Sequence, residues 1–195
     1  MEYLPHQGGD DLPTPEAREA LRIKSIVIPA DDAQPLRQHE LAVTDLDAYQ
    51  ELVGGNIEAI GLDDPAASMY FHGDGKHLDL PVNGRATLLL WAHVSELRFR
   101  DYIVGDAFLT GPLDRDGNDT DVSDEFTKLF FETSDLRIAV RTYGDSKWYT
   151  NDLSFDEWSS AYAYALDLGH RWTQVEDIRV VTEQPLRPPQ SEERS

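Results

Sequence analysis

No apolar run in this chain is long enough to cross a lipid bilayer. The longest extends from Ala86 to Val94 and is interrupted by Thr87 and His93, whereas a membrane-spanning helix needs about 20 predominantly apolar residues. The core must therefore be built from short helices and strands, and we expect a soluble protein without a membrane partner. The first residues show no secretory signal, and the chain has no cysteine, so the sequence favours a cytoplasmic location.

Several short segments have the composition or the alternation of β-strands. The clearest is Leu136–Tyr143, whose apolar residues fall on one face. Its expected partner is Lys147–Thr150, across a turn at Gly144-Asp145. Further strands are predicted over residues 21–28, 56–61, 102–110 and 175–182, and a hairpin over residues 69–80.

Three helices are predicted from capping residues and apolar periodicity. Thr44 is the expected N-cap of the first, which Gly54 ends, because a left-handed terminal residue suits glycine. Asn83 is the expected cap of the second, over residues 85–97. A capping box that begins at Ser154 opens the third, which is expected to run to Leu168.

The order of these elements predicts an α+β fold of two small lobes, with mixed or antiparallel sheets and helices packed on one face. We expect the N-terminal lobe to cover residues 21–112 and the C-terminal lobe residues 123–182, with an acidic loop between them. Residues 1–20 and 183–195 are rich in proline and charge, and they are expected to form a disordered arm and tail.

The strongest global signal is a formal net charge of −20, from 37 acidic and 17 basic residues. Such a field repels nucleic-acid phosphates and attracts basic protein surfaces, so we expect no direct binding of nucleic acid. Duplex DNA carries one charge per about 1.7 Å, so the same charge spans roughly one helical turn of about 34 Å. The charge therefore admits a DNA mimic that occupies a basic protein cleft. The alternative is that the carboxylates only keep the protein dissolved.

Four segments resemble one protein family in their order and spacing. They are Ile26–Pro29, Leu52–Glu58, Leu80–Thr87 and Ile103–Ala107. On these segments, residues 23 to about 125 resemble domain-of-unknown-function family 3846, an uncharacterised family seen mainly in actinobacteria and their phages. The resemblance implies a phage or mobile-element context, and with it proteins that interfere with host machinery. It implies no activity and no catalytic residue.

The segment around Asn83 and Arg85 is a candidate ligand site. A helix N-terminus with these side chains can hold an anion, and His93 lies further along the same predicted helix. The three residues are therefore the candidates for binding a small ligand. The alternative is structural, with Asn83 as a cap and Arg85 in a supporting contact.

The acidic loop from Asp114 to Glu125 has part of a calcium-binding pattern. Asp114, Asp116 and Asn118 would supply oxygen ligands at relative positions 1, 3 and 5, and Glu125 would do so at position 12. However, an aspartate stands where such a loop needs glycine, so we expect no cofactor, with calcium as the alternative. The same loop carries the carboxylates expected to contact a protein partner: Asp116, Asp119, Asp121 and Asp124.

No nucleophile elbow, zinc-protease helix or phosphate-binding Gly-Lys-Ser/Thr occurs in the sequence. Enzymatic activity is therefore the less favoured class. The sequence favours a phage-like, acidic protein-interaction protein whose partner is a host protein with a basic surface. DNA mimicry and inhibition of host defence are specific forms of that function. The alternative is a small-ligand or metal-dependent protein, enzymes included, with a pocket near Asn83 and Arg85.

Overall fold

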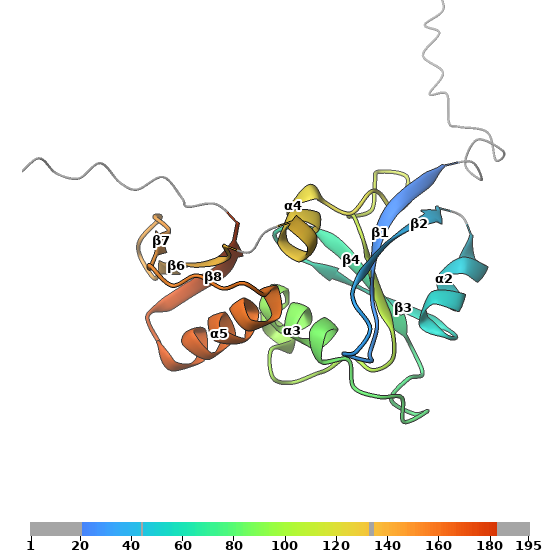
Figure 1. Ribbon diagram of the computed structural model, residues 1–195, viewed down its shortest axis with the longest axis horizontal. Coiled ribbons are helices and arrows are strands. Elements are labelled where there is room, and N and C mark those ends of the chain that lie inside the picture. The colour runs from blue at the N-terminus through green and yellow to red at the C-terminus, as the bar shows by residue number, and fades with distance from the viewer. Residues whose placement is uncertain (1–20, 44, 133–134, 183–195) are drawn as a thin grey trace, which may run out of the picture.

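The computed structural model describes residues 21–43, 45–132 and 135–182. The expected arm and tail, and Thr44, lie outside these residues. The prediction of Thr44 as the N-cap of the first helix is wrong, because Asp45 caps that helix and its side chain accepts a hydrogen bond from the amide of Ala48 at 3.0 Å. The described part of the chain is an α+β fold with two antiparallel sheets (Figure 1), which confirms the predicted fold class. None of its helices is both long and apolar enough to span a membrane.

The larger sheet has the strand order β2-β1-β5-β4-β3. Its strands are β1 (Arg22–Ile28), β2 (Arg37–Ala42), β3 (Ile57–Leu62), β4 (Ala67–His72) and β5 (Ala107–Thr110). The last strand in sequence, β5, lies in the middle of the sheet and pairs antiparallel with both β1 and β4. All four of its residues are buried, so this short segment forms the centre of the fold.

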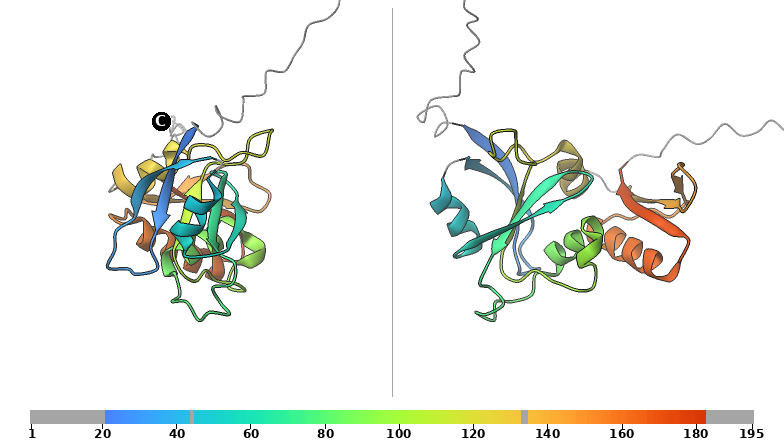
Figure 2. Two further views of the ribbon diagram at one scale, coloured as in Figure 1. Left: turned by 90° about the vertical axis from the view of Figure 1, so that its right-hand side faces the viewer. Right: turned by 180° about the vertical axis from the view of Figure 1, so that it is seen from behind.

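Helices cover both faces of the larger sheet, because its side chains alternate between them. Tyr70 and Phe108 face α2 (Leu46–Val53), where the ring of Tyr49 packs edge-on against each of them at 5.2 Å. On the opposite face, Met69 and Leu109 belong to the cluster of buried residues that includes α3 (Gly84–His93) and α4 (Asp124–Thr127). Figure 2 shows the sheet lying between α2 and these two helices.

The smaller sheet has the order β7-β6-β8, with β6 (Arg137–Thr142), β7 (Tyr149–Thr150) and β8 (Val175–Val181). The predicted pairing of β6 with the segment across Gly144-Asp145 is confirmed. Helix α5 (Trp158–Arg171) covers one face of this sheet and packs on α3. One hydrophobic cluster contains Leu109 of the larger sheet, Ile138 of the smaller one and Ala161 of α5, so the two sheets share a continuous core.

The capping box predicted at Ser154 does not form. Helix α5 begins at Trp158, with Glu157 as an N-cap whose side chain makes no capping bond. The reason is that Phe155 pairs with Leu136 through two backbone hydrogen bonds of 2.9 and 3.0 Å, which keep this segment extended. The helix also continues through Gly169 to Arg171, beyond its predicted end.

The predicted hairpin over residues 69–80 is also wrong. Strand β4 pairs with β3, and not with residues 78–80. Residues 74–80 form consecutive turns instead, in which the amides of His77 and Leu78 both donate to the carbonyl of Asp74. The predicted helix over residues 85–97 ends at His93, and Ser95–Leu97 form a separate 3-10 turn, η1.

Candidate functional site

Asn83 caps α3, as the sequence predicted, and its side chain is fully used within the fold. The side-chain oxygen accepts a hydrogen bond from the amide of Ala86 at 3.0 Å. The side-chain nitrogen donates to the carbonyls of Ile28 at 2.8 Å and Gly105 at 3.0 Å. Because Asn83 is completely buried, it joins α3 to two strand ends and does not face a ligand.

Arg85 fixes the loop between β1 and β2 against the start of α3. Its guanidinium donates to the carbonyls of Pro29, Asp31 and Gln34 at 2.6, 3.0 and 2.8 Å. The carboxylate of Asp32 lies 3.5 Å from its Nε. Most of the donors of this side chain are therefore occupied by the protein, although the side chain lies in the wall of a groove.

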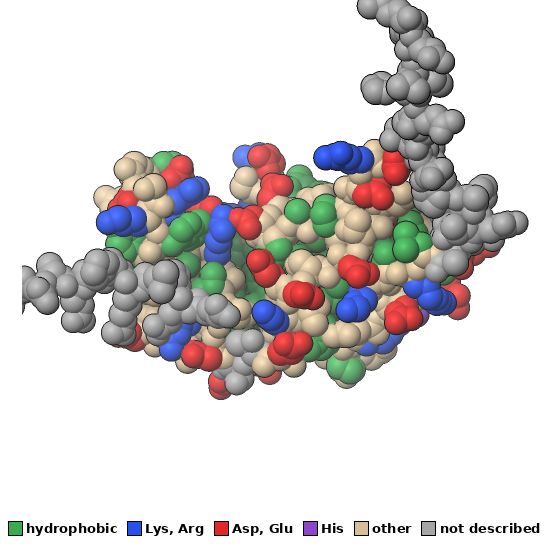
Figure 3. Space-filling view, turned by 90° about the horizontal axis from the view of Figure 1, so that it is seen from above, with side chains coloured by type: hydrophobic (Ala, Val, Ile, Leu, Met, Phe, Trp, Pro, Cys, Tyr) green, Lys and Arg blue, Asp and Glu red, His purple; other side chains and the backbone are tan. Residues whose placement is uncertain are grey.

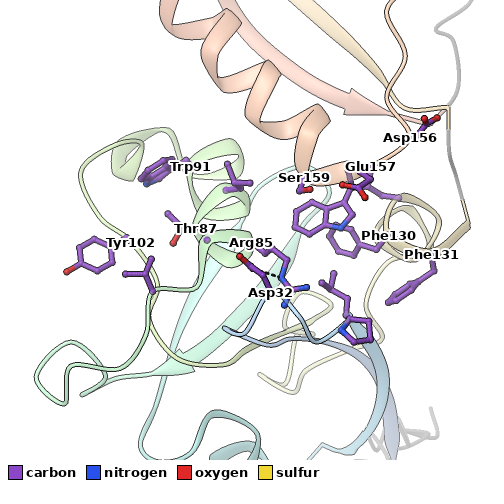
Figure 4. A pocket seen from close by; sticks show the side chains of 17 residues that line it. Asp32, Arg85, Thr87, Trp91, Tyr102, Phe130, Phe131, Asp156, Glu157 and Ser159 are labelled. Atoms are coloured by element: carbon purple, nitrogen blue, oxygen red, sulfur yellow. Dashed lines mark ion pairs between the residues drawn. The ribbon is translucent and has the colours of Figure 1, made fainter.

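The groove beside Arg85 has a volume of about 1070 Å³. Figure 4 shows Trp91 and Tyr102 on one side of it and Phe130 and Phe131 on the other. Trp158 also lines the groove. The second wall comes from α5 and from η2 (Lys128–Glu132), a π-helical turn that follows α4. Segments far apart in the chain thus build one aromatic-lined site.

Hydrogen bonds and ring packing with neighbouring residues hold the aromatic side chains of this groove in place. The indole nitrogen of Trp91 donates to the carbonyl of Asp101 at 2.6 Å. On the other wall, the ring of Phe130 packs against Trp158 at 4.8 Å and against Phe126 at 5.5 Å. Such packing fixes the rings before any ligand arrives and lowers the entropic cost of binding.

His93 lines a different cavity, of about 820 Å³, between α3, α5 and β8. Its Nδ1 lies 2.7 Å from the carbonyl of Asp63, and its Nε2 lies 2.8 Å from the hydroxyl of Tyr162. Burial lowers the pKa of His93, which favours the neutral ring. A neutral ring satisfies both contacts if Nδ1–H donates to Asp63 and Nε2 accepts from Tyr162. The three candidate residues Asn83, Arg85 and His93 therefore do not meet in one pocket.

Asp114, Asp116 and Glu125, the acidic candidates for binding calcium, are not gathered into one site. Both carboxylate oxygens of Asp114 are engaged within the loop by the backbone amides of Asp116 and Asn118 and by the Asn118 side chain. Glu125 lies in the first turn of α4 behind the Ser123 cap. Among the described residues, no group of three or more acidic, histidine or cysteine side chains is placed to hold a metal ion.

The four carboxylates expected to contact a partner differ in their exposure to solvent. Asp116, Asp121 and Asp124 are exposed, and the side chain of Asp121 accepts a hydrogen bond from the amide of Lys24 at 2.8 Å. Asp119 is buried with 7% of its surface exposed. Three of the four side chains are therefore accessible to a partner.

The buried Asp119 accepts hydrogen bonds from three hydroxyl groups. Tyr49 and Tyr70 donate to one of its oxygens at 2.9 and 2.8 Å, and Thr110 donates to the other at 2.6 Å. Burial, together with the nearby carboxylate, raises the pKa of both tyrosines, which keeps them protonated as donors. No sequence pattern indicates this cluster, because its members are far apart in the chain and Asp119 stands among many other acids.

The remaining carboxylates are mixed with basic side chains over much of one face. In the face shown in Figure 3, Asp and Glu alternate with Lys and Arg and with apolar side chains. A local acidic site is therefore better supported on this face than one continuous negative strip.

These features define an antiparallel α+β protein with an aromatic groove beside a capped helix N-terminus. Residues 23–135 match the family model described as "Domain of unknown function (DUF3846)". The match covers more than half of the chain, and the protein belongs to this family. No curated protein and no solved structure gives a significant match. The family segment ends before β6, so it contains Arg85 and Phe130 of the groove, whereas Trp158 lies outside it.

Proposed function

We propose that this protein acts by binding a partner protein that has a basic surface. The observation that carries the proposal is that few carboxylates are neutralised within the fold. Ion pairs among the described residues engage only seven of them: Asp32, Asp64, Asp101, Asp135, Asp167, Glu176 and Asp177. With a net charge of −20, the protein attracts cationic surfaces from outside.

Several of the few basic side chains are also directed at the protein itself. Arg85 is engaged by backbone carbonyls, and Arg98 donates to the carbonyls of Trp91 and Ala92. Arg141 and Arg179 lie over the ring of Trp148, at 5.3 and 4.4 Å from its centre. These cations support local structure and leave exposed carboxylates elsewhere without compensation.

DNA mimicry and inhibition of a host defence are specific forms of this proposal, and a cytoplasmic location belongs to it. A duplex mimic needs its carboxylates along one elongated face. The mixture of charges in Figure 3 supports a local binding site more than a duplex-like face. The phage-related context implied by the family resemblance supports a host protein as the partner.

The experiment is capture of partners by the tagged full chain from its native cell, at about 0.1 M and about 1 M salt, where the screening length falls from about 10 to about 3 Å. The expected result is a small set of basic proteins, identified by mass spectrometry, that is retained only at the lower salt. A captured nuclease or DNA-binding protein is then tested for loss of duplex binding. Retention of no basic protein at the lower salt overturns the proposal.

A small-ligand function is the second candidate, because the groove of about 1070 Å³ includes Arg85 in its wall. Asn83 does not support it, since that side chain is buried and fully bonded. Screening of small organic anions by thermal shift tests it. A ligand that raises the melting temperature of the wild-type protein, and not of a Tyr102→Ala variant, would favour this candidate.

A further inference from the structure

The groove beside Arg85 is lined by several apolar side chains that stay exposed to solvent and lie outside the buried core. Val82, Tyr102 and Phe131 line it with 58%, 45% and 40% of their surface accessible. Large exposed apolar side chains gathered around one concave site are typical of binding surfaces, and tyrosine and tryptophan are common anchors in them. The groove therefore offers apolar contact area to another molecule.

The rim of the same groove is acidic. The side chain of Asp32 is 81% exposed, and its one ion pair with a described residue is the long contact to Arg85. Asp156 and Glu157 are exposed just before α5, and neither forms an ion pair with any residue in the described part of the chain. Among the described residues that line the groove, Arg85 is the only basic one, and it already binds three carbonyls. An apolar floor with a negative rim favours a ligand that is itself apolar and basic.

We propose that this groove binds a segment of the partner protein in which an aliphatic or aromatic anchor is flanked by lysine or arginine. The anchor packs between Phe131 and Tyr102, and the flanking cations reach Asp156 and Glu157. Arginine and lysine also bind favourably over aromatic faces, so the cations and the rings support each other. This inference rests on the proposed function, and it assigns the contact surface.

The charge of the chain argues against the other occupants. A second copy would bring a second net charge of −20 to the same acidic rim. Residues 1–20 contain five acidic residues and one arginine, so they carry the same sign as the rim. Residues 183–195 contain Arg187 between prolines. The test must therefore exclude that this segment of the same chain occupies the groove.

The test begins by selecting binders to the full chain from a displayed library of random peptides. The expected sequences combine an apolar anchor with lysine or arginine. The strongest peptide is then synthesised and titrated by calorimetry. Phe131→Ser and the double change Asp156→Asn with Glu157→Gln are each expected to weaken its binding by about tenfold or more.

Matched controls separate the groove from general effects of the substitutions. Tyr143→Ser removes an exposed ring, 69% accessible, that does not line the groove. Glu51→Gln with Glu58→Gln removes two exposed carboxylates on α2 and β3. Both controls are expected to change the affinity by less than about twofold. Circular dichroism and melting curves show that each variant is folded.

Four results overturn the inference. The first is a set of selected peptides that lack basic residues or apolar anchors, and the second is a Phe131→Ser variant that binds the peptide as tightly as the wild type does. The third is a rise of about tenfold in peptide affinity on deletion of residues 183–195, which would make that segment the occupant. A concentration-dependent dimer that Phe131→Ser abolishes would make the occupant a second copy.

Capture from the native cell distinguishes this inference from the proposed function. Loss of the basic partner with Phe131→Ser, and its retention with Tyr143→Ser, supports both. A basic partner retained equally by Phe131→Ser overturns only the assignment of the groove. Capture of no basic partner by the wild-type chain overturns the proposed function itself.

Discussion

The imidazole Nε2 of His93 lies 2.8 Å from the hydroxyl oxygen of Tyr162, and this contact joins α3 to α5. Tyr162 is buried, with 3% of its surface exposed, and belongs to the core that the two sheets share. Because the other ring nitrogen of His93 contacts the carbonyl of Asp63, a second proton on the ring would have to be donated to the Tyr162 oxygen, and the Tyr162 O–H would have to turn away from Nε2. The protonation state of one histidine therefore affects how the two parts of the fold are held together.

We expect the stability of the protein to fall at mildly acidic pH because of His93. Its pKa in the folded state is lowered from the ordinary value of about 6.5, so the unfolded chain binds the proton more readily. The stability that the neutral His93 contributes is fully present above about pH 6.5 and is lost as the pH falls below that value. The total loss is about 1.4 kcal/mol for each unit by which folding lowers the pKa of His93. Urea unfolding from about pH 8 to about pH 5 measures the effect.

The control for this pH dependence is His93→Gln, which removes the titrating group. Asp63, Asp64, Glu125 and Arg98 line the same cavity, and they are present in both proteins. The stability of the wild type relative to the variant should therefore decrease on acidification. Parallel unfolding free energies across the whole range would contradict the assignment to His93.

Tyr162→Phe should destabilise the protein by about 1 kcal/mol, because it removes a buried hydrogen bond and leaves Nε2 of His93 without its donor. Tyr164→Phe, on the same helix, is the matched control, since no hydrogen bond from that hydroxyl is found within the described residues. A double-mutant cycle with His93→Gln should show a coupling energy of about 0.5 kcal/mol or more. Additive effects of the two changes would mean that the contact contributes nothing to stability.

Asp119→Ala should be strongly destabilising. It leaves the hydroxyls of Tyr49, Tyr70 and Thr110 without their acceptor in a buried site, and each such loss costs roughly 1–3 kcal/mol. Chemical unfolding should show a loss of about 3 kcal/mol or more. The exposed Asp116→Ala, in the same loop, is expected to stay within about 0.5 kcal/mol of the wild type. Equal effects of the two changes would show that the cluster is unimportant.

Gly111→Ala should destabilise the loop that follows β5. An added Cβ would overlap the carbonyl oxygen of Asp121 and the hydroxyl of Thr120, and the backbone cannot yield as a flexible side chain can. The expected cost is about 2 kcal/mol by urea unfolding. Gly61→Ala, where a Cβ meets no neighbouring atom, is the control and should be close to neutral. A neutral result at both positions would mean that the loop moves freely.

Calcium is expected to leave the protein unchanged. In the acidic loop the carboxylate of Asp114 already accepts hydrogen bonds from Asp116 and Asn118, and these contacts lower its pKa. Asp119, at the sixth loop position, points into the protein and binds three hydroxyls. Titration calorimetry with millimolar calcium should give no binding heat. A saturable heat that Asp114→Asn abolishes would restore the calcium-loop interpretation.

Local sequence signals predicted the helix ends and strands that are decided locally. Gly54 ends α2 in the left-handed conformation, and Asn83 caps α3, since each depends only on residues within one turn. The first four residues of β2, Arg37 to Glu40, contain no buried side chain, so their pattern does not indicate a strand. Such polar strands lie at sheet edges, where pattern alone cannot identify them.

The groove could be predicted only in part. Arg85 was recognised beside a helix N-terminus, but the opposite wall depends on how α5 packs against α3, which no local pattern encodes. Trp158, the first residue of α5, is half-buried where it lines the groove. The capping box at Ser154 does not form because Phe155 pairs with Leu136, and this tertiary contact outweighs the local preference.

Arg85 holds the β1–β2 loop through main-chain oxygens, which every amino acid provides. The exposed side chain of Asp32 can therefore be exchanged without loss of these three contacts. Natural variation in this loop would change the side chains that contact a peptide segment bound in the groove. The backbone of the loop would keep its position, provided that Arg85 is kept. Members of the family could in this way diverge in partner preference on an unchanged scaffold.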